Sequence, residues 1–166
     1  MKIFTINSVE KIDCSQTWET KAGATLRVLT KDSYSLLVLR FFLYDKEELK
    51  KTGDIRGLRT YTVRNQNPGR LGGMEFHRLR WEYVIGLEGG FEWLCEDLWG
   101  QKKISIISVS KGILLPPSIL HTFKAVEKNS GLLVVCNTLF NPSDEKTWDS
   151  YPESEFRKLQ QELHLD

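Results

Sequence analysis

Short apolar segments separated by turn-forming residues make up most of this chain and constrain its fold more than any other feature. The segments are rich in valine, isoleucine, leucine and aromatic residues, which favour β-strands, and glycine, proline, asparagine or aspartate separates them. This pattern is typical of an all-β sandwich or barrel. The predicted strands are Lys2–Thr5, Ala24–Thr30, Tyr34–Tyr44, Leu58–Asn65, Met74–Leu79, Glu82–Leu87, Phe91–Glu96, Lys103–Val109, His121–Val126 and Leu132–Thr138. We therefore expect two β-sheets packed face to face.

Two segments break the strand pattern. Near the C-terminus, Pro152 suits a first helical position, and apolar residues then recur at three- and four-residue steps. These apolar residues are Phe156, Leu159 and Leu163. They predict an amphipathic helix over about residues 152–164 that packs on the β-core. The other segment, Asp45–Glu48, has a capping-box pattern and predicts either one helical turn or a solvated loop.

Length and charge limit the number of domains and the kinds of partner. The 166 residues predict one domain, 1–166, with a β-core over about residues 24–140. The 23 Lys+Arg and 22 Asp+Glu give a net charge of +1, which excludes the strongly basic surface typical of nucleic-acid binding. The most apolar stretch, Leu36–Tyr44, contains Arg40 and is far shorter than the roughly 20 residues of a membrane helix. We expect neither nucleic acid nor a membrane as a partner.

The cysteines and the N-terminus favour a cytoplasmic location. Cys14, Cys95 and Cys136 are odd in number and widely spaced, which argues against a disulfide framework or a cysteine zinc site. The N-terminus has no apolar segment with a small-residue cleavage site, so no signal peptide is predicted. We therefore expect a protein of the reducing cytoplasm.

A glycine-rich segment in the middle of the chain carries the candidate chemistry. Glu75 and His77 are two residues apart, so on a strand both side chains extend from the same face. Glu82 adds a second carboxylate among apolar residues, and His121 follows a double-proline turn that fixes the start of a later strand. If this face points into the barrel, two acids and two imidazoles share one pocket.

These residues resemble the first motif of the cupin superfamily, in which a glycine, a His-x-His pair, a glutamate and a second glycine follow at fixed spacings. The positions are occupied in register by Gly69, Glu75, His77, Glu82 and Gly89. Glu75 stands where cupins usually have histidine. The second cupin motif is matched by Pro116 and His121, with Ser110, Ser118 and Ala125 in place of its other residues. The resemblance implies a double-stranded β-helix, the cupin jelly-roll barrel.

Within the cupins the chain resembles the dTDP-sugar 3,5-epimerases and 3,4-ketoisomerases, through the segments Gly73–His77, Leu115–Phe123 and Asn137–Pro142. The resemblance implies a small-molecule sugar nucleotide as substrate, a role in carbohydrate or polysaccharide synthesis, and proton transfer beside a keto group. It assigns the base to Glu75, with His77 or His121 polarising the carbonyl or returning a proton. A carboxylate base here requires burial to raise its pKa towards the working pH.

The epimerase tyrosine that protonates the opposite face of the sugar has no match in Val134–Asn137. Relatives of this kind usually pair through an edge strand, so the resemblance also implies a homodimer.

A non-catalytic cupin that binds a sugar or a metal is the alternative. Glu75, His77, Glu82 and His121 form a set of two histidines and two carboxylates that suits Mn, Fe, Ni or Zn. The same acids and imidazoles can instead satisfy one another by hydrogen bonds. We expect either no cofactor or one divalent transition metal.

Four arginines surround the first motif: Arg64, Arg70, Arg78 and Arg80. Guanidinium groups match phosphate oxygens in charge and geometry, so these residues are candidates for binding the substrate diphosphate. The other interpretation is that these arginines lie on a solvent-exposed edge strand, where their charges prevent the edge from pairing with another chain.

Overall fold

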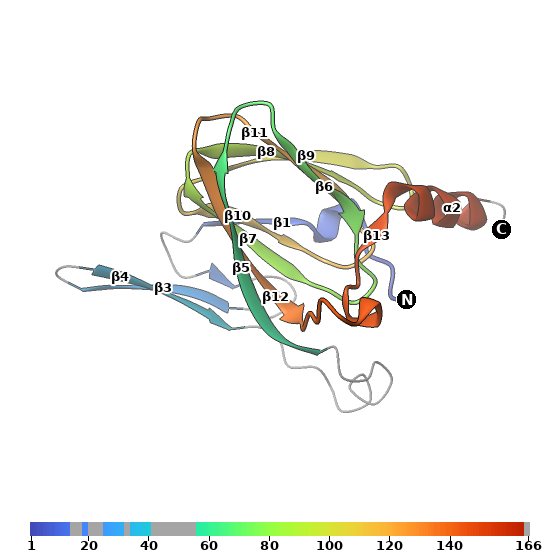
Figure 1. The fold of residues 1–166 in the computed structure, drawn as a ribbon, viewed down its shortest axis with the longest axis horizontal. Helices are drawn as coiled ribbons and strands as arrows, with labels where there is room; N and C mark the ends of the chain where they lie inside the picture. Colours follow the sequence, from blue (N-terminus) through green and yellow to red (C-terminus); the bar gives the residue numbers. More distant parts are fainter. Residues whose placement is uncertain (14–17, 20–24, 32–33, 41–55, 165–166) are drawn as a thin grey trace.

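The computed structural model describes residues 1–13, 18–19, 25–31, 34–40 and 56–164. Two five-stranded antiparallel sheets form the body of the protein (Figure 1). The first contains, in spatial order, β1 (Glu10–Asp13), β10 (Lys111–Leu115), β7 (Glu82–Glu88), β12 (Ser130–Thr138) and β5 (Arg56–Gln66). The second contains β13 (Tyr151–Pro152), β6 (Leu71–Phe76), β11 (Leu120–Ala125), β8 (Gly90–Glu96) and β9 (Lys102–Ser108). The predicted all-β jelly roll with a C-terminal helix is confirmed.

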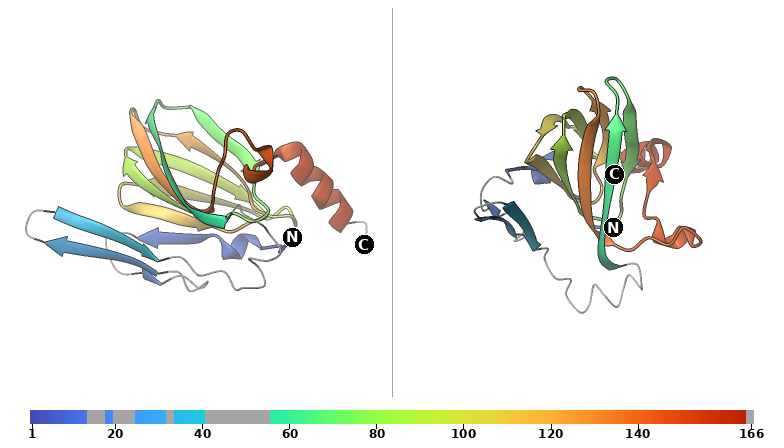
Figure 2. Two further views of the ribbon diagram at one scale, coloured as in Figure 1. Left: turned by 60° about the horizontal axis from the view of Figure 1, so that its bottom comes forward. Right: turned by 60° about the vertical axis from the view of Figure 1, so that its left-hand side comes forward.

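A smaller sheet and two short helices complete the described part. The sheet consists of β2 (Trp18–Glu19), β3 (Thr25–Lys31) and β4 (Tyr34–Arg40), and the β3–β4 hairpin projects beyond the two larger sheets (Figure 2). The 3-10 helices are η1 (Ile6–Ser8) and η3 (Glu145–Thr147).

The hydrophobic core lies between the two larger sheets, because alternate side chains of their strands point inward. The first sheet contributes Val84, Ile113, Leu115, Leu132 and Val134. The second contributes Phe91, Trp93, Cys95, Ile107 and Ala125. Packing between these side chains holds the two sheets together. It also fixes the relative positions of the ends of β6, β7 and β11, where polar residues lie.

Helix α2 (Glu153–Leu163) packs on the second sheet, within one residue of the predicted bounds. It begins directly after Pro152, and its fully buried Phe156 lies 5.4 Å from the ring of Phe76 on β6. An ion pair and hydrogen bonds between Arg157 and Glu96 fasten the same helix to the end of β8. The helix thus supports the strand that carries the glycine-rich motif.

Three details differ from the predicted strands. Lys2–Thr5 does not form a strand; the backbone N–H of Phe4 donates to the hydroxyl of Ser118 at 2.8 Å, and the first strand is β1. Strands β1, β2, β10 and β13 were not predicted. The strand predicted over Met74–Leu79 ends at Phe76. Asp45–Glu48, Ala24 and residues 41–44 lie outside the described residues.

Among the described residues, no helix has both the length and the apolar character that crossing a bilayer requires.

Candidate active site

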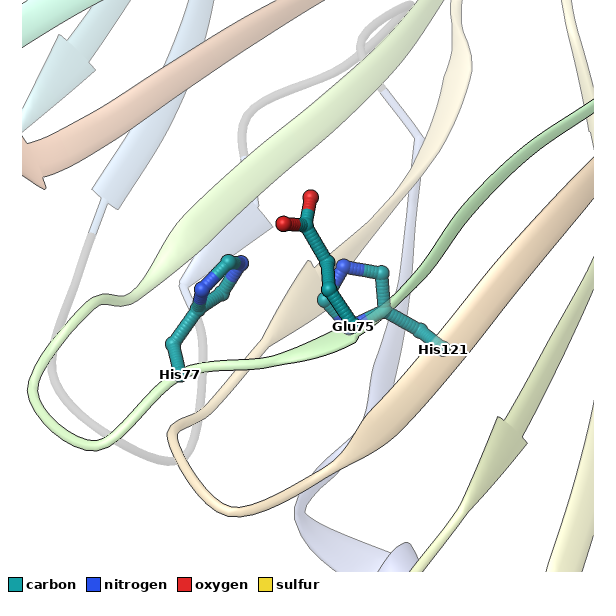
Figure 3. A group of neighbouring side chains, drawn as sticks. All are labelled: Glu75, His77 and His121. Carbon is teal, nitrogen blue, oxygen red and sulfur yellow. The ribbon is translucent and has the colours of Figure 1, made fainter. Parts of the chain in front are cut away.

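Two acids and two imidazoles meet at one end of the two sheets. Glu75 is the penultimate residue of β6 and His77 follows that strand, Glu82 begins β7, and His121 is near the start of β11. The ligand atoms of Glu75, His77 and His121 all lie within 4.8 Å of one another, and Figure 3 shows the carboxylate gathered with the two rings. Glu82 Oε1 is 3.5 Å from His77 Nε2, and Oε2 is 3.9 Å from His121 Nε2. The structure therefore brings the four predicted residues together.

A β-bulge in β6 aims Glu75 at this cluster. His121 pairs with Glu75, whereas Thr122 pairs with Gly73, so Met74 is an extra residue without a partner on β11. Met74 has a φ of 81°, in the left-handed region that side chains other than glycine rarely adopt. Glu75 and His77 reach the same cluster as expected, but the bulge precedes both residues and His77 lies just beyond the end of β6 rather than on the strand.

The second cupin motif keeps its backbone geometry although its glycines are absent. Ser110 and Ser118 both have a φ of 61°, the left-handed conformation for which glycine is the usual residue. The N–H of Ser118 donates to the carbonyl of His77 at 2.7 Å. The turn that precedes His121 is thus fastened directly to the loop that carries the other imidazole.

Backbone carbonyls set the orientation of both imidazoles. His77 Nδ1 lies 2.6 Å from the carbonyl of Asp149, and His121 Nδ1 lies 3.1 Å from the carbonyl of Ile119. A carbonyl oxygen only accepts hydrogen bonds, so both Nδ1 atoms carry the proton and both Nε2 atoms face the acids. His77 Nε2 is buried and has no hydrogen-bond partner among the described residues.

Asp149 holds the loop between β6 and β7 in place. Its carboxylate accepts the backbone N–H groups of Arg78, Leu79 and Arg80 at 2.9, 3.0 and 2.8 Å. Because its carbonyl also accepts from His77, Asp149 links the loop to the segment after β12. The sequence patterns did not predict this positioning role.

Glu82 is a buried anion with cationic and imidazole neighbours. Arg80, which is only 4 % exposed, places a terminal nitrogen 3.3 Å from Glu82 Oε1 and also donates to Thr138 and to the carbonyl of Trp148. Burial alone raises the pKa of Glu82, but His77, His121 and Arg80 outweigh it and hold the pKa well below its usual range. Glu82 is therefore ionised at neutral pH.

Glu75 is also ionised, in contrast to the expectation from sequence. It is half-buried, and burial alone raises its pKa, but His77, His121 and a hydrogen bond from the Ser150 hydroxyl lower the pKa below the ordinary value. The requirement that burial raise the pKa of this carboxyl is not met. The group is instead an ionised carboxylate at neutral pH.

His121 and Tyr61 have pKa values shifted in opposite directions. Burial and His77 lower the pKa of His121 more than Glu82 and Glu75 raise it, so this ring is neutral. Burial and Glu82 raise the pKa of Tyr61, so its hydroxyl keeps its proton. The site thus combines an ionised acid with a protonated phenol.

A cavity of about 460 Å³ opens beside the cluster. It is lined by Arg59, Tyr61, Glu75, Arg80, Phe140, Trp148 and Ser150. His77 and His121 are buried and do not form part of its wall. Glu75 is thus the member of the cluster that lines the cavity, together with Tyr61.

Tyr61 was missed by the sequence analysis. It lies on β5 opposite Val134 of β12, at the level of the segment in which a tyrosine was sought, and its hydroxyl is 3.3 Å from Glu82 Oε1. Only the strand register shows that Tyr61 lies beside this segment.

The four predicted arginines do not act together. Arg80 lines the cavity, whereas Arg78 pairs with Glu155 at 3.0 Å and lies over the ring of Tyr151, so it fastens α2. Arg64 and Arg70 are exposed at the other end of β5 and β6, beyond the residues that pair near the cluster. Arg64 pairs there with Glu88 at 3.6 Å.

Part of the predicted metal-ligand set suits a divalent ion. Glu75, His77 and His121 have the donor types and the mutual spacing that a transition metal accepts. Glu82 is held by Arg80, and a dication beside this buried guanidinium would be repelled. The three-residue set therefore has the spacing for a metal, and the ion pair with Arg80 disfavours Glu82 as a fourth ligand.

Comparison with solved structures places the fold among sugar-nucleotide isomerases. The TDP-fucose-3,4-ketoisomerase WlaRA from Campylobacter jejuni superposes with a TM-score of 0.64 at 18 % identity, over 94 % of this chain and 98 % of that one. The 3,4-ketoisomerase QdtA from Thermoanaerobacterium thermosaccharolyticum gives 0.64 at 14 %, over 96 % and 98 %. The dTDP-4-dehydrorhamnose 3,5-epimerase from Bacillus anthracis gives 0.52 at 14 %, over 84 % and 89 %.

One of the two sequence comparisons identifies a family. A search with the sequence finds no match among curated proteins. The family model described as FdtA, WxcM-like, C-terminal matches residues 41–155, which is more than half of the chain. The chain therefore belongs to the FdtA (WxcM-like, C-terminal) family.

Proposed function

We propose that this protein is a sugar-nucleotide 3,4-ketoisomerase, which moves a keto group between neighbouring carbons of a nucleotide-linked sugar by proton transfer. The observation that carries the proposal is the ionised Glu75 carboxylate on the wall of a cavity that also contains the protonated Tyr61 hydroxyl. A base and an acid on one wall are what proton transfer beside a carbonyl requires.

Isomerisation is favoured over 3,5-epimerisation. The two 3,4-ketoisomerases match nearly the whole of this chain and of their own, with TM-scores of 0.64, whereas the 3,5-epimerase gives 0.52 and covers less of both. The 3,5-epimerases also use a histidine base at the position of Glu75, as the motif resemblance implies. These differences support a ketoisomerase with a carboxylate base.

The proposed reaction needs only two groups of the wall. Glu75 removes the proton from C3 of a 4-keto sugar while Tyr61 gives its hydroxyl proton to O4, which forms an enediol. Glu75 then returns its proton to C4, and the O3 hydroxyl loses its proton to the Tyr61 oxygen, which leaves a 3-keto sugar. No atom is gained or lost. In this scheme His77 and His121 act through Glu75, whose pKa they lower, and Tyr61 takes the role that the sequence assigned to a histidine.

The test is to incubate the protein with TDP-4-keto-6-deoxyglucose and follow the keto carbon by NMR. The expected product is the 3-keto isomer. Deuterium from heavy water at C3 and C5, without movement of the keto group, would indicate a 3,5-epimerase. No change in TDP-, UDP- or GDP-linked keto sugars would overturn a catalytic function and favour a binding module.

Metal binding is the second candidate, and the spacing of Glu75, His77 and His121 favours it. These three residues would hold the ion, and the ion would polarise the substrate carbonyl. Elemental analysis of the purified protein separates the two cases: one equivalent of metal per chain that chelators remove together with activity would replace the metal-free scheme.

We also propose a homodimer in the cytoplasm. Cys95 and Cys136 are free and buried, which suits a reducing compartment. Sedimentation as a monomer would contradict the dimer, and fractionation of cells checks the location.

A further inference from the structure

Arg59 is an arginine of the cavity wall that none of the sequence motifs indicated. The other arginine in this wall, Arg80, is neutralised by Glu82, whereas Arg59 has no ion pair with any carboxylate of the described residues. Its guanidinium carbon lies 5.4 Å from the ring centre of Tyr61 and 5.3 Å from that of Phe140. A positive charge is therefore held between two aromatic rings with no anion against it.

Cys136 restrains this guanidinium. Arg59 pairs directly with Cys136 across β5 and β12, and Arg59 Nε donates to the Cys136 sulfur at 3.2 Å. Cys136 is completely buried, so the hydrogen bond comes from the interior side of the arginine. Because Nε is engaged, the two terminal nitrogens with their four N–H donors are left for a ligand.

We infer that Arg59, oriented by Cys136, binds the diphosphate of the nucleotide sugar, an inference that rests on the proposed function. A guanidinium fork matches phosphate oxygens with two parallel hydrogen bonds. Cys136 also pairs with Glu82, so Arg59, Cys136 and Glu82 lie side by side on three neighbouring strands. Two strand spacings separate Arg59 from Glu82, about 10 Å between their backbones. This separation leaves room for one sugar ring between the diphosphate and the acids.

The test compares the binding of TDP and of thymidine monophosphate by titration calorimetry. Arg59→Gln is expected to weaken TDP binding about tenfold or more, because a hydrogen bond to a charged group is lost. It should also remove most of the preference for TDP over the monophosphate. Arg64→Gln is the matched control, since Arg64 lies on the same strand at its other end. Its TDP affinity should equal that of the wild type.

Arg59→Lys keeps the charge without the fork and should fall between the wild type and Arg59→Gln, which keeps the test valid if the glutamine variant is unstable. Cys136→Ala should weaken TDP binding and Cys136→Ser should restore it, because a hydroxyl accepts the same hydrogen bond. Wild-type affinity in Arg59→Gln, with keto-sugar turnover intact in the wild type, overturns this inference alone. Failure of the wild type to bind TDP, UDP or GDP overturns the proposed function as well.

Discussion

Glu82 and His77 face each other inside the protein, with 3.5 Å between Oε1 and Nε2 and only 2 % of either residue exposed. The same oxygen lies 3.3 Å from the guanidinium of Arg80. A carboxylate this deeply buried is stable only while its cationic partner remains. Glu82 therefore holds His77 and Arg80 in position beneath the cavity, and Glu75, on the cavity wall, is the acid that a substrate contacts.

Glu82→Gln should destabilise the fold strongly. The substitution leaves the Arg80 guanidinium buried without its counter-ion, which costs about 3–5 kcal/mol of unfolding free energy. Urea unfolding followed by tryptophan fluorescence measures the change. The double variant Arg80→Met with Glu82→Leu removes both charges and should recover most of the loss. A cost below about 1 kcal/mol for Glu82→Gln would contradict the description of a tightly coupled pair.

Glu75→Gln should abolish turnover and keep the fold. The amide has nearly the shape of the carboxylate but cannot accept a proton, and loss of a general base typically lowers the rate about 10²–10⁴-fold. NMR with the keto-sugar nucleotide measures turnover, and the melting temperature checks folding. Glu162→Gln, at an exposed position of α2, is the control and should be fully active. Turnover retained in Glu75→Gln would exclude Glu75 as the base.

Tyr61→Phe should lower kcat about a hundredfold with little change in KM, because the hydroxyl acts on the enediol oxygen rather than on the bound ground state. Initial rates across substrate concentrations separate the two constants. Tyr151→Phe is the matched control, since Tyr151 lies on β13 against Arg78 and outside the cavity wall. An unchanged kcat in Tyr61→Phe would assign the acid to another group.

Most strands were predictable from local pattern, and two of the errors have physical causes. The unpredicted β10 contains Gly112, where a Cβ would approach the carbonyl oxygen of Val84 to 2.2 Å. A glycine that permits close strand contact looks the same in sequence as a turn glycine. Lys2–Thr5 has the alternation of a strand but no strand partner, and Ser118 takes its N–H group instead.

Site residues that belong to one sequence motif could be predicted. Site residues that are brought together by the pairing register of distant strands could not. Glu75 and His77 were found from their spacing, whereas the bulge at Met74, which places Glu75 opposite His121, was not predictable from it. Arg64 and Arg59 are five residues apart on β5, and only the pairing of Arg59 with Cys136 places it near the acids. Arg64 is close in sequence to the glycine-rich motif, but it lies near the turn between β5 and β6, at the end of the sheets opposite to the acids.

The free energy of unfolding should fall as the solution is acidified. In the folded state burial and His77 lower the pKa of His121, so near the ordinary histidine pKa of 6.5 the unfolded chain binds a proton that the folded chain does not. Stability is therefore lost as pH falls through this value. The pKa values of Glu75 and Glu82 are lowered too, so below the ordinary glutamate pKa of 4.5 the unfolded carboxylates are protonated first and the loss continues in the same direction.

Melting temperatures between about pH 7.5 and about pH 5 isolate the contribution of His121. His121→Asn removes the titrating group and should flatten the curve over this range. His164→Asn, at the exposed end of α2 and outside the cluster of acids and imidazoles, is the control and should keep the slope of the wild type. A wild-type melting temperature that rises on acidification from pH 7 to pH 6 would mean that His121 is stabilised as an imidazolium by Glu82 and Glu75. The balance between burial and the two acids would then be the reverse of the one described here.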